Sequence, residues 1–333
     1  MKKKILLIAT GGTIASLKAE SGLTPLIKAD EILSYIPTVY EFCEPEAIQI
    51  CNIDSTNMEP KHWKLIVQTI REHYEEYDGF VIAHGTDTMA YTAAALSYMI
   101  QNSNKPIVLT GAQKSIDLEI TDAKTNLLDS FRYASDEKSQ GVQIVFGGKV
   151  IAGTRAKKIR SKSYNAFESI DYPALAMIQD NRIMRYIEPI PYQEPVTFYE
   201  EMNQNIFLMK LIPGISPKGL QFFFEQYDAI IVESFGVGGI PASIADVFYE
   251  LNEKYPEKVI ILATQVAHEG SDMTVYEVGN KIKKDCSILE SYDMTLEAVI
   301  AKTMWMLGDN NRGNSKVEEI FYKKINYDLI FEP

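Results

Sequence analysis

The stretch from Lys3 to Ser16, KKILLIATGGTIAS, constrains the fold more than any other part of the chain. Its apolar residues run up to Thr10 and predict a buried β-strand. Gly11 and Gly12 follow, and glycine lets the backbone turn sharply because it has no Cβ to clash. Thr13 comes just after the turn, so its hydroxyl is expected at the carboxyl end of a parallel strand, where open α/β sheets bind ligands. Backbone N–H groups of such a turn can stabilise an oxyanion.

Taken alone, TGGT fits an ordinary strand-to-loop turn equally well, because one glycine pair with a hydroxyl is a weak signal. The chain contains neither GxGxxG nor GxxxxGK[ST], so nucleotide binding has no support in the sequence.

The composition is that of a globular protein and excludes several classes of partner. The 333 residues favour about two domains. A net charge of −12 argues against nucleic acid and anionic lipid surfaces as partners. No apolar stretch is long enough for a membrane-spanning helix. Three scattered cysteines, Cys43, Cys51 and Cys286, make a poor disulfide framework and favour the reducing cytoplasm.

Strand patterns alternate with helix patterns, which predicts an α/β fold with crossover connections. We expect a larger N-terminal α/β domain over residues 1–188, with an open, mostly parallel sheet flanked by helices. A proline-containing linker at 189–204 and a smaller C-terminal α/β domain at 205–333 follow. Residues 153–170, GTRAKKIRSKSYNAFESI, are expected to be basic and irregular.

A second strand end shows the same pattern of apolar strand, glycine and threonine. The segment GFVIAHGTDT places Thr86 and Asp87 after an apolar strand and a glycine. Asp87 suits an ammonium group, and Lys158 in GTRAKK can accept a threonine proton if burial or a neighbour lowers its pKa. Thr13, Thr86, Asp87 and Lys158 at one sheet edge would form a catalytic constellation.

Each of these residues also has a simpler interpretation. Thr86 and Asp87 fit a cap for the helix expected to start near Met89, and Lys158 fits a solvated surface charge. Ser55 and Thr56, in IDSTNM, fit a turn. His84 fits a packed, hydrogen-bonded histidine better than a ligand, because no second histidine lies at metal-ligand spacing, and no zinc site is predicted.

The chain resembles the bacterial-type L-asparaginases, and within them the cytoplasmic type I branch. The resemblance runs in order over nearly the whole chain. It is carried by TGGTIAS at 10–16, IDSTNM at 53–58, YDGFVIAHGTDTMAYTAAALS at 77–97, GAQ at 111–113, GTRAKK at 153–158, and SFGVGG and ATQ in the second half. TGGTI together with HGTDTM is the most specific part.

The resemblance implies hydrolysis of asparagine to aspartate and ammonia, with Thr13 forming an acyl-enzyme. Thr86, Asp87 and Lys158 would form the second catalytic cluster, and Asp87 would also hold the substrate ammonium. Ser55 and Thr56 would hold the α-carboxylate, and the Ala112 carbonyl would receive the departing amide nitrogen. No metal or organic cofactor is implied, and a homodimer or homotetramer is expected.

Three positions depart from the family pattern. Many relatives carry a tyrosine in the mobile loop after the first strand, where this chain has Leu23. Tyr276 is the substitute activator that we predict for Thr13, although an ordinary packed tyrosine is the simpler interpretation. The cysteine and threonine of a second, regulatory asparagine site are replaced by Val266 and Lys157, so that site is expected to be weak or absent.

Three other functions remain open at this stage. One is a glutamine-preferring or mixed amidohydrolase of the same family. Another is one component of a tRNA-dependent amidotransferase. It is disfavoured by the acidic charge and by the nucleophile strand starting at residue 3, where such a component would carry an extra N-terminal domain. The third is a non-catalytic amino-acid-binding homologue, which the missing loop tyrosine would suit.

Overall fold

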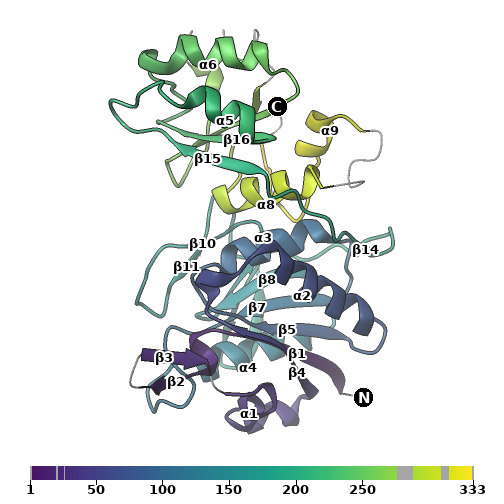
Figure 1. The fold of residues 1–333 in the computed structure, drawn as a ribbon. Helices are drawn as coiled ribbons and strands as arrows, with labels where there is room; N and C mark the ends of the chain where they lie inside the picture. The colour runs from purple at the N-terminus through teal and green to yellow at the C-terminus, as the bar shows by residue number, and fades with distance from the viewer. Residues whose placement is uncertain (1, 20–21, 26, 276–287, 309–314, 332–333) are drawn as a thin grey trace. The chain divides into compact units, whose positions relative to one another are not determined.

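A computed structural model describes residues 2–19, 22–25, 27–275, 288–308 and 315–331 (Figure 1). The chain divides into two compact units, Met1–Glu200 and Glu201–Pro333. This division falls inside the stretch predicted as a linker. Part of that stretch is regular, because β14 (Thr197–Phe198) pairs with β6 (Ile100–Gln101).

An eight-stranded sheet forms the centre of the first unit. In sheet order its strands are β13 (Arg182–Arg185), β12 (Ala176–Gln179), β9 (Lys149–Ala152), β8 (Gly141–Phe146), β7 (Pro106–Thr110), β5 (Gly79–Ala83), β1 (Lys3–Gly11) and β4 (Cys43–Ile53).

The strands from β8 to β4 are all parallel, and β9, β12 and β13 add an antiparallel edge. This mostly parallel sheet confirms the predicted fold class. The chain leaves β1 for β4 on one side and then returns to β5 on the other. The order therefore reverses at the β1–β5 pair, and ligands of doubly wound sheets bind at such a switch point. Ile5 to Ala9 of β1 are fully buried, as a central parallel strand requires.

Helices cover both faces of this sheet. In Figure 1, α2 and α3 lie on one face and α1 and α4 lie on the other. Helix α3 is buried at nearly every position, because it lies between the sheet and α2. The bounds of these helices are α1 (Ala29–Ser34), α2 (Pro60–His73), α3 (Met89–Met99) and α4 (Ala123–Ala134), with short 3-10 turns η1 (Thr13–Ala15), η2 (Pro37–Glu41) and η3 (Ser55–Asn57).

The expectation of an irregular segment at 153–170 is wrong. This segment contains an antiparallel pair, β10 (Ala156–Lys158) with β11 (Phe167–Ser169), in which Lys158 lies opposite Phe167. The strands have only three residues each, too few for a period-2 pattern to stand out among five basic residues. A second short pair joins β2 (Ser16–Ala19) to β3 (Gly22–Pro25).

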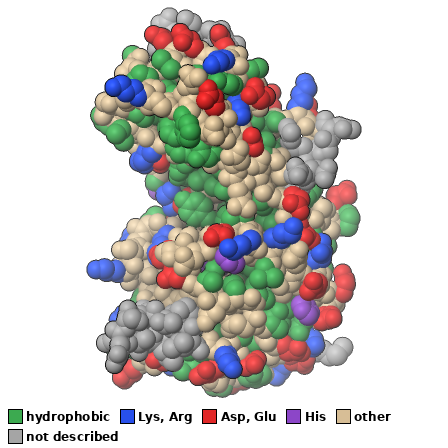
Figure 2. All heavy atoms as spheres, viewed as in Figure 1, with side chains coloured by type: hydrophobic (Ala, Val, Ile, Leu, Met, Phe, Trp, Pro, Cys, Tyr) green, Lys and Arg blue, Asp and Glu red, His purple; other side chains and the backbone are tan. Residues whose placement is uncertain are grey.

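The molecular surface mixes both signs of charge. Figure 2 shows acidic and basic side chains interspersed over the displayed face. No helix of the described part of the chain is long and apolar enough to cross a membrane.

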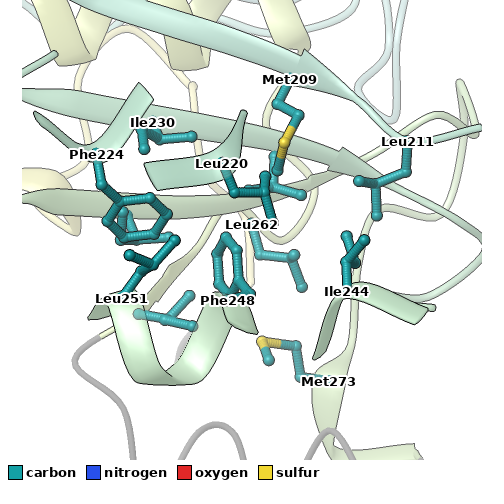
Figure 3. Packing of buried hydrophobic residues seen from close by; sticks show 13 residues of the cluster. Met209, Leu211, Leu220, Phe224, Ile230, Ile244, Phe248, Leu251, Leu262 and Met273 are labelled. Carbon is teal, nitrogen blue, oxygen red and sulfur yellow. The ribbon is translucent and has the colours of Figure 1, made fainter. Parts of the chain in front are cut away.

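The second unit has a smaller parallel sheet, in the order β15 (Ile206–Lys210), β16 (Ala229–Ser234), β17 (Val259–Thr264) and β18 (Ile288–Glu290). Its helices are α5 (Leu220–Gln226), α6 (Ala242–Lys254), α8 (Leu296–Met306) and α9 (Val317–Phe321), with the turn η4 (Met273–Val275). Figure 3 shows its core, in which Phe224 and Phe248 of α5 and α6 pack on Ile230 and Leu262 of the sheet. This unit therefore has a hydrophobic core of its own.

Candidate active site

The bend after β1 depends on its two glycines. Gly11 and Gly12 have φ angles of +106° and +81°, which side chains rarely tolerate. The Gly12 N–H donates to the Ile53 carbonyl at the end of β4, with an N···O distance of 3.0 Å. Thr13 opens η1 directly after this bend and is half-buried. Thr13 therefore lies at the carboxyl edge of the sheet.

Three bends touch each other at this edge. A Cβ atom built on Gly12 would lie 2.5 Å from Gly85 Cα, and one built on Gly85 would lie 2.6 Å from Ser55 Oγ. No real side chain atom fits such gaps, so only glycine permits this packing. The bends after β1, β4 and β5 are consequently in direct contact. Thr13, Ser55 and Thr86 each lie within one residue of these contacts.

Lys158 joins the second hydroxyl to a carboxylate. Its Nζ atom donates to Thr86 Oγ1 at 2.8 Å and to Asp87 Oδ1 at 2.6 Å. Strand β10 holds the lysine in place across 71 residues of sequence. The Lys158 side chain is 15% exposed and that of Asp87 is 60% exposed. The structure thus brings together three of the predicted site residues, and Lys158 is not a solvated surface charge.

The capping interpretation of Thr86 and Asp87 is wrong. The N-cap of α3 is Thr88, and Thr88 does not cap the helix either, because its hydroxyl donates to the Ser55 carbonyl at 2.7 Å. The Asp87 N–H donates to Ser55 Oγ at 3.3 Å. Asp87 is therefore left to pair with Lys158 and to face solvent.

Ser55 and Thr56 differ in their surroundings. Ser55 is buried between the bends, whereas Thr56 is exposed. The Thr56 hydroxyl and N–H both bond to Asp54 Oδ1, at 2.9 and 2.8 Å, in a capping turn that starts η3. The turn interpretation is therefore confirmed for Thr56, and Ser55 is the member that packs into the edge.

His84 is fully buried and hydrogen-bonded on both ring nitrogens, which confirms its interpretation as a packed histidine. Nδ1 donates to the Gly85 carbonyl at 2.6 Å, since a carbonyl can only accept. Nε2 then accepts from the Thr92 hydroxyl at 3.0 Å, and Thr92 in turn accepts from the Trp63 indole at 2.9 Å. Burial lowers the pKa of His84 to about 4, so the ring is neutral at physiological pH.

The Ala112 loop lies against the same edge. Ala112 is buried, and a Cβ atom on the preceding Gly111 would lie 2.3 Å from the His84 carbonyl oxygen. Asp122 and Asn126, which the sequence interpretation missed, hold this loop. Two polar residues four apart, on one face at the start of α4, are the signal that could have found them.

The structure describes little of the remaining predicted residues. Tyr276 lies outside the described residues. Leu23 lies in β3, and its side chain is also outside the described part. Val266 is 50% exposed. Within the described residues, no group of three or more His, Cys, Asp or Glu side chains could hold a metal ion.

These features define a class of protein: an α/β protein with two threonine-bearing bends at the switch point of a parallel sheet, one of them coupled to a lysine–aspartate pair. A lysine beside a threonine hydroxyl can move its proton, and the partly exposed carboxylate can bind a cationic group.

The comparison with family profiles agrees with this class. The family described as "Asparaginase, N-terminal" matches residues 4–191, and "Glutaminase/Asparaginase C-terminal domain" matches residues 205–321. The chain belongs to the asparaginase family.

Individual relatives are similar over almost the whole chain. The L-asparaginase of Thermococcus kodakarensis is 37% identical, and the match covers 97% of this chain and 98% of that protein. A glutamyl-tRNA(Gln) amidotransferase component from Pyrococcus abyssi is 33% identical, over 92% of this chain and 72% of that protein.

The same similarity holds for solved structures. The thermostable L-asparaginase structure from Thermococcus kodakarensis superposes with a TM-score of 0.91 at 35% identity, covering 99% of this chain and 100% of that chain. L-asparaginase I from Vibrio cholerae gives a TM-score of 0.86 at 26% identity over the same shares.

Proposed function

We propose that this protein hydrolyses the side-chain amide of L-asparagine to L-aspartate and ammonia, through an ester with a threonine. The observation that carries the proposal is the contact of Lys158 Nζ with both Thr86 Oγ1 and Asp87 Oδ1, beside the bend that bears Thr13. Membership of the asparaginase family supports the same reaction.

The first half-reaction forms the ester. Thr13 Oγ attacks the amide carbon and loses its proton as the new C–O bond forms. The backbone N–H groups of Thr13 and Thr86 stabilise the oxyanion, and each such donor typically contributes a few kcal/mol. When the C–N bond breaks, the leaving nitrogen takes up the proton that Thr13 lost and departs as ammonia.

The second half-reaction consumes water. Water attacks the ester carbon and gives a proton to Thr86 Oγ1, and Lys158 relays the hydroxyl proton of Thr86 onward to Thr13 Oγ as the C–O bond to Thr13 breaks. Aspartate leaves, and the Thr13 hydroxyl regains its proton. Each step moves protons among groups that the chain itself supplies, and both half-reactions use one oxyanion site.

Substrate binding uses the polar groups of the three bends. Asp87, with its exposed carboxylate, would hold the α-ammonium group. Ser55 and Thr56 would hold the α-carboxylate, and the Ala112 carbonyl would accept a hydrogen bond from the amide nitrogen. One anionic group and several donors match a zwitterionic amino acid. For the activation of Thr13 we propose Tyr276.

Glutamine is the second candidate substrate. It differs from asparagine by one methylene, which typically gives only about 1–3 kcal/mol of discrimination. The name of the C-terminal family domain includes glutaminase, which favours testing it. The resemblance to the amidotransferase component extends over 72% of the Pyrococcus abyssi protein, so a tRNA-dependent role is the further alternative.

Measuring ammonia release from asparagine and from glutamine tests the proposal. Wild type is expected to release ammonia from asparagine, and Thr13→Ala is expected to lose activity by about 10³-fold or more. Calorimetry with asparagine then separates catalysis from binding. Binding without ammonia release in the wild type would instead support a non-catalytic homologue.

We also propose a cytoplasmic location and a homodimer or homotetramer. The free thiols of Cys43 and Cys51 suit a reducing compartment, and a structural neighbour from Campylobacter jejuni is named a probable cytoplasmic L-asparaginase. Light scattering of the purified protein tests the number of chains in the assembly.

A further inference from the structure

Asp122 lies at the N-cap position of α4, but its carboxylate binds a different segment of the chain. It is the N-cap residue of α4, yet its carboxylate makes no capping bond to that helix. The Thr121 hydroxyl oxygen accepts from the Ala123 N–H instead, at 3.0 Å. Asp122 is only 7% exposed, and its carboxylate turns to the loop that carries Ala112.

The carboxylate binds two consecutive backbone N–H groups of that loop. The Gln113 N–H donates to Asp122 Oδ2 at 2.9 Å and to Oδ1 at 3.1 Å. The Lys114 N–H donates to Oδ1 at 3.1 Å. The Gln113 N–H belongs to the same planar trans peptide as the Ala112 carbonyl, and the two point in opposite directions. Fixing the N–H therefore fixes the direction of the Ala112 carbonyl.

Asn126 holds the other side of Ala112. One turn along α4, its Nδ2 atom donates to the Gly111 carbonyl at 3.0 Å and to Asp122 Oδ2 at 3.3 Å. Its Oδ1 atom accepts from the Gly147 N–H at 3.0 Å. The peptides before and after Ala112 are therefore both held by the first turn of one helix.

The loop that carries Ala112 is also hydrogen-bonded to two other segments of the site. The Ile116 N–H donates to the carbonyl of Ile14, the residue after Thr13, at 3.4 Å. Gln113 Nε2 donates to the Ser163 carbonyl at 3.2 Å, in the hairpin that carries Lys158. The loop that carries Ala112 is thus tied to the segment after Thr13 and to the hairpin that carries Lys158.

We propose that Asp122 is a positioning residue that aims the Ala112 carbonyl at the nitrogen leaving the substrate. The inference rests on the proposed function. All three groups facing the carboxylate are donors, so an acceptor-only side chain is required. Asp122→Asn would place an amide NH₂ against the Gln113 N–H or the Asn126 amide, and the Ala112 peptide would rotate.

Comparing an amide with an ester tests this role. L-Aspartic acid β-methyl ester has the same acyl group as asparagine but no N–H on its leaving group. Asp122→Asn is expected to lower kcat/KM for asparagine about 10-fold, the effect of one hydrogen bond. For the ester the decrease should stay within about 2-fold, because that substrate makes no such bond. The inhibition constant of L-aspartate, which also lacks the amide, should not rise.

Asp293→Asn is the matched control. Asp293 is also buried and accepts from two consecutive N–H groups, those of Ile330 and Phe331, but in the other unit. Asp293→Asn should leave the ratio of amide to ester hydrolysis unchanged. Thr121→Val, which removes the hydroxyl donating to the Lys114 carbonyl, is the milder variant if Asp122→Asn does not fold. It should shift the ratio in the same direction.

Equal losses on amide and ester in a folded Asp122 variant would overturn the inference, and so would a rise in the aspartate inhibition constant alone. A wild type that releases neither ammonia nor methanol would instead remove the proposed function. The two failures are therefore distinguishable.

Discussion

Each unit of the molecule contains a lysine–aspartate pair, and their geometry is almost the same. Lys158 Nζ lies 2.6 Å from Asp87 and 2.8 Å from the Thr86 hydroxyl. Lys302 Nζ lies 2.6 Å from Asp328 and 2.7 Å from the Lys323 carbonyl. Distance alone therefore does not separate the two pairs.

The pairs differ in exposure. Lys302 and Asp328 are both 0% exposed, whereas the Asp87 side chain is 60% exposed beside a lysine that is only 15% exposed. Burial lowers the pKa of Lys302, and Asp328 opposes that shift. A pair enclosed on all sides can only hold the chain together. A pair with one open member can still bind a ligand, so exposure predicts which aspartate meets the substrate.

The largest predicted effects come from Lys158→Met and Lys302→Met. The first should lower activity, and the second should lower stability. The first is expected to lower kcat by about 10³-fold, within the usual range for a group that transfers protons, with little change in stability. The second should cost about 3–5 kcal/mol, because it leaves the Asp328 carboxylate buried without its partner. Steady-state kinetics and urea unfolding measure the two effects. An active Lys158→Met variant would show that exposure does not identify the pair that acts on the substrate.

A second prediction tests whether the stability of the protein depends on Lys302 and Asp328 being present together. Replacing both members, in Lys302→Met with Asp328→Leu, removes the uncompensated charge. The double variant should regain at least about 1–2 kcal/mol over Lys302→Met, although the Ile325 N–H loses Asp328 Oδ1 as its acceptor. Urea unfolding of the three variants measures this coupling. A double variant less stable than Lys302→Met would show that Asp328 acts mainly on the backbone.

A third prediction concerns the bend after β5, which carries Asp87 of the first pair. Gly85→Ala is expected to lower activity about 100-fold, because its Cβ would lie 2.6 Å from Ser55 and push the bends apart. Gly236 follows a strand in the second unit and has no atom within 4 Å of its would-be Cβ. Gly236→Ala should therefore cost only the strain of its φ of +51°, and activity should stay within about 3-fold. Ammonia release compares the two variants.

Much of the first unit could be predicted, because its signals are local. The apolar run before Gly11 and the repeat of strand, glycine and threonine at Thr86 identify two parallel strand ends. The rule that ligands bind at such ends brings them together. Family resemblance added the roles of Ser55, Thr56 and Ala112 by motif. No sequence pattern could show that Gly12 and Gly85 touch, since their contact depends on two crossovers closing at the same edge.

Other parts could not be predicted, for reasons that are equally physical. The β10–β11 pair is too short for periodicity to reveal it, so the segment carrying Lys158 was expected to be irregular. Asp122 resembles an ordinary helix cap in sequence, and only its missing capping bond shows that it serves another loop. The role of Tyr276 stays a prediction, because that residue lies outside the described part of the chain.

The last prediction concerns His84, which separates exposure from location. It lies two residues from Thr86, yet it is as enclosed as Lys302, so exposure predicts a structural role. Its pKa is lowered from 6.5 to about 4, so the unfolded chain takes up the proton first as the pH falls. The stability contributed by neutral His84 should therefore be complete above about pH 7 and decrease by about 2 kcal/mol at pH 5.

His84→Gln tests this role because glutamine keeps a donor and an acceptor but does not titrate. Unfolding by urea at pH 7.5 and pH 5 should show a smaller loss of stability for the variant than for wild type, by about those 2 kcal/mol. Its kcat at pH 7.5 should stay within about 10-fold of wild type, since the imidazole bonds to Gly85 and Thr92 rather than to a reacting group. If kcat instead fell as far as in Lys158→Met while the pH dependence of stability stayed unchanged, location at the sheet edge would matter more than exposure. The contrast between the two lysine–aspartate pairs would then need another explanation.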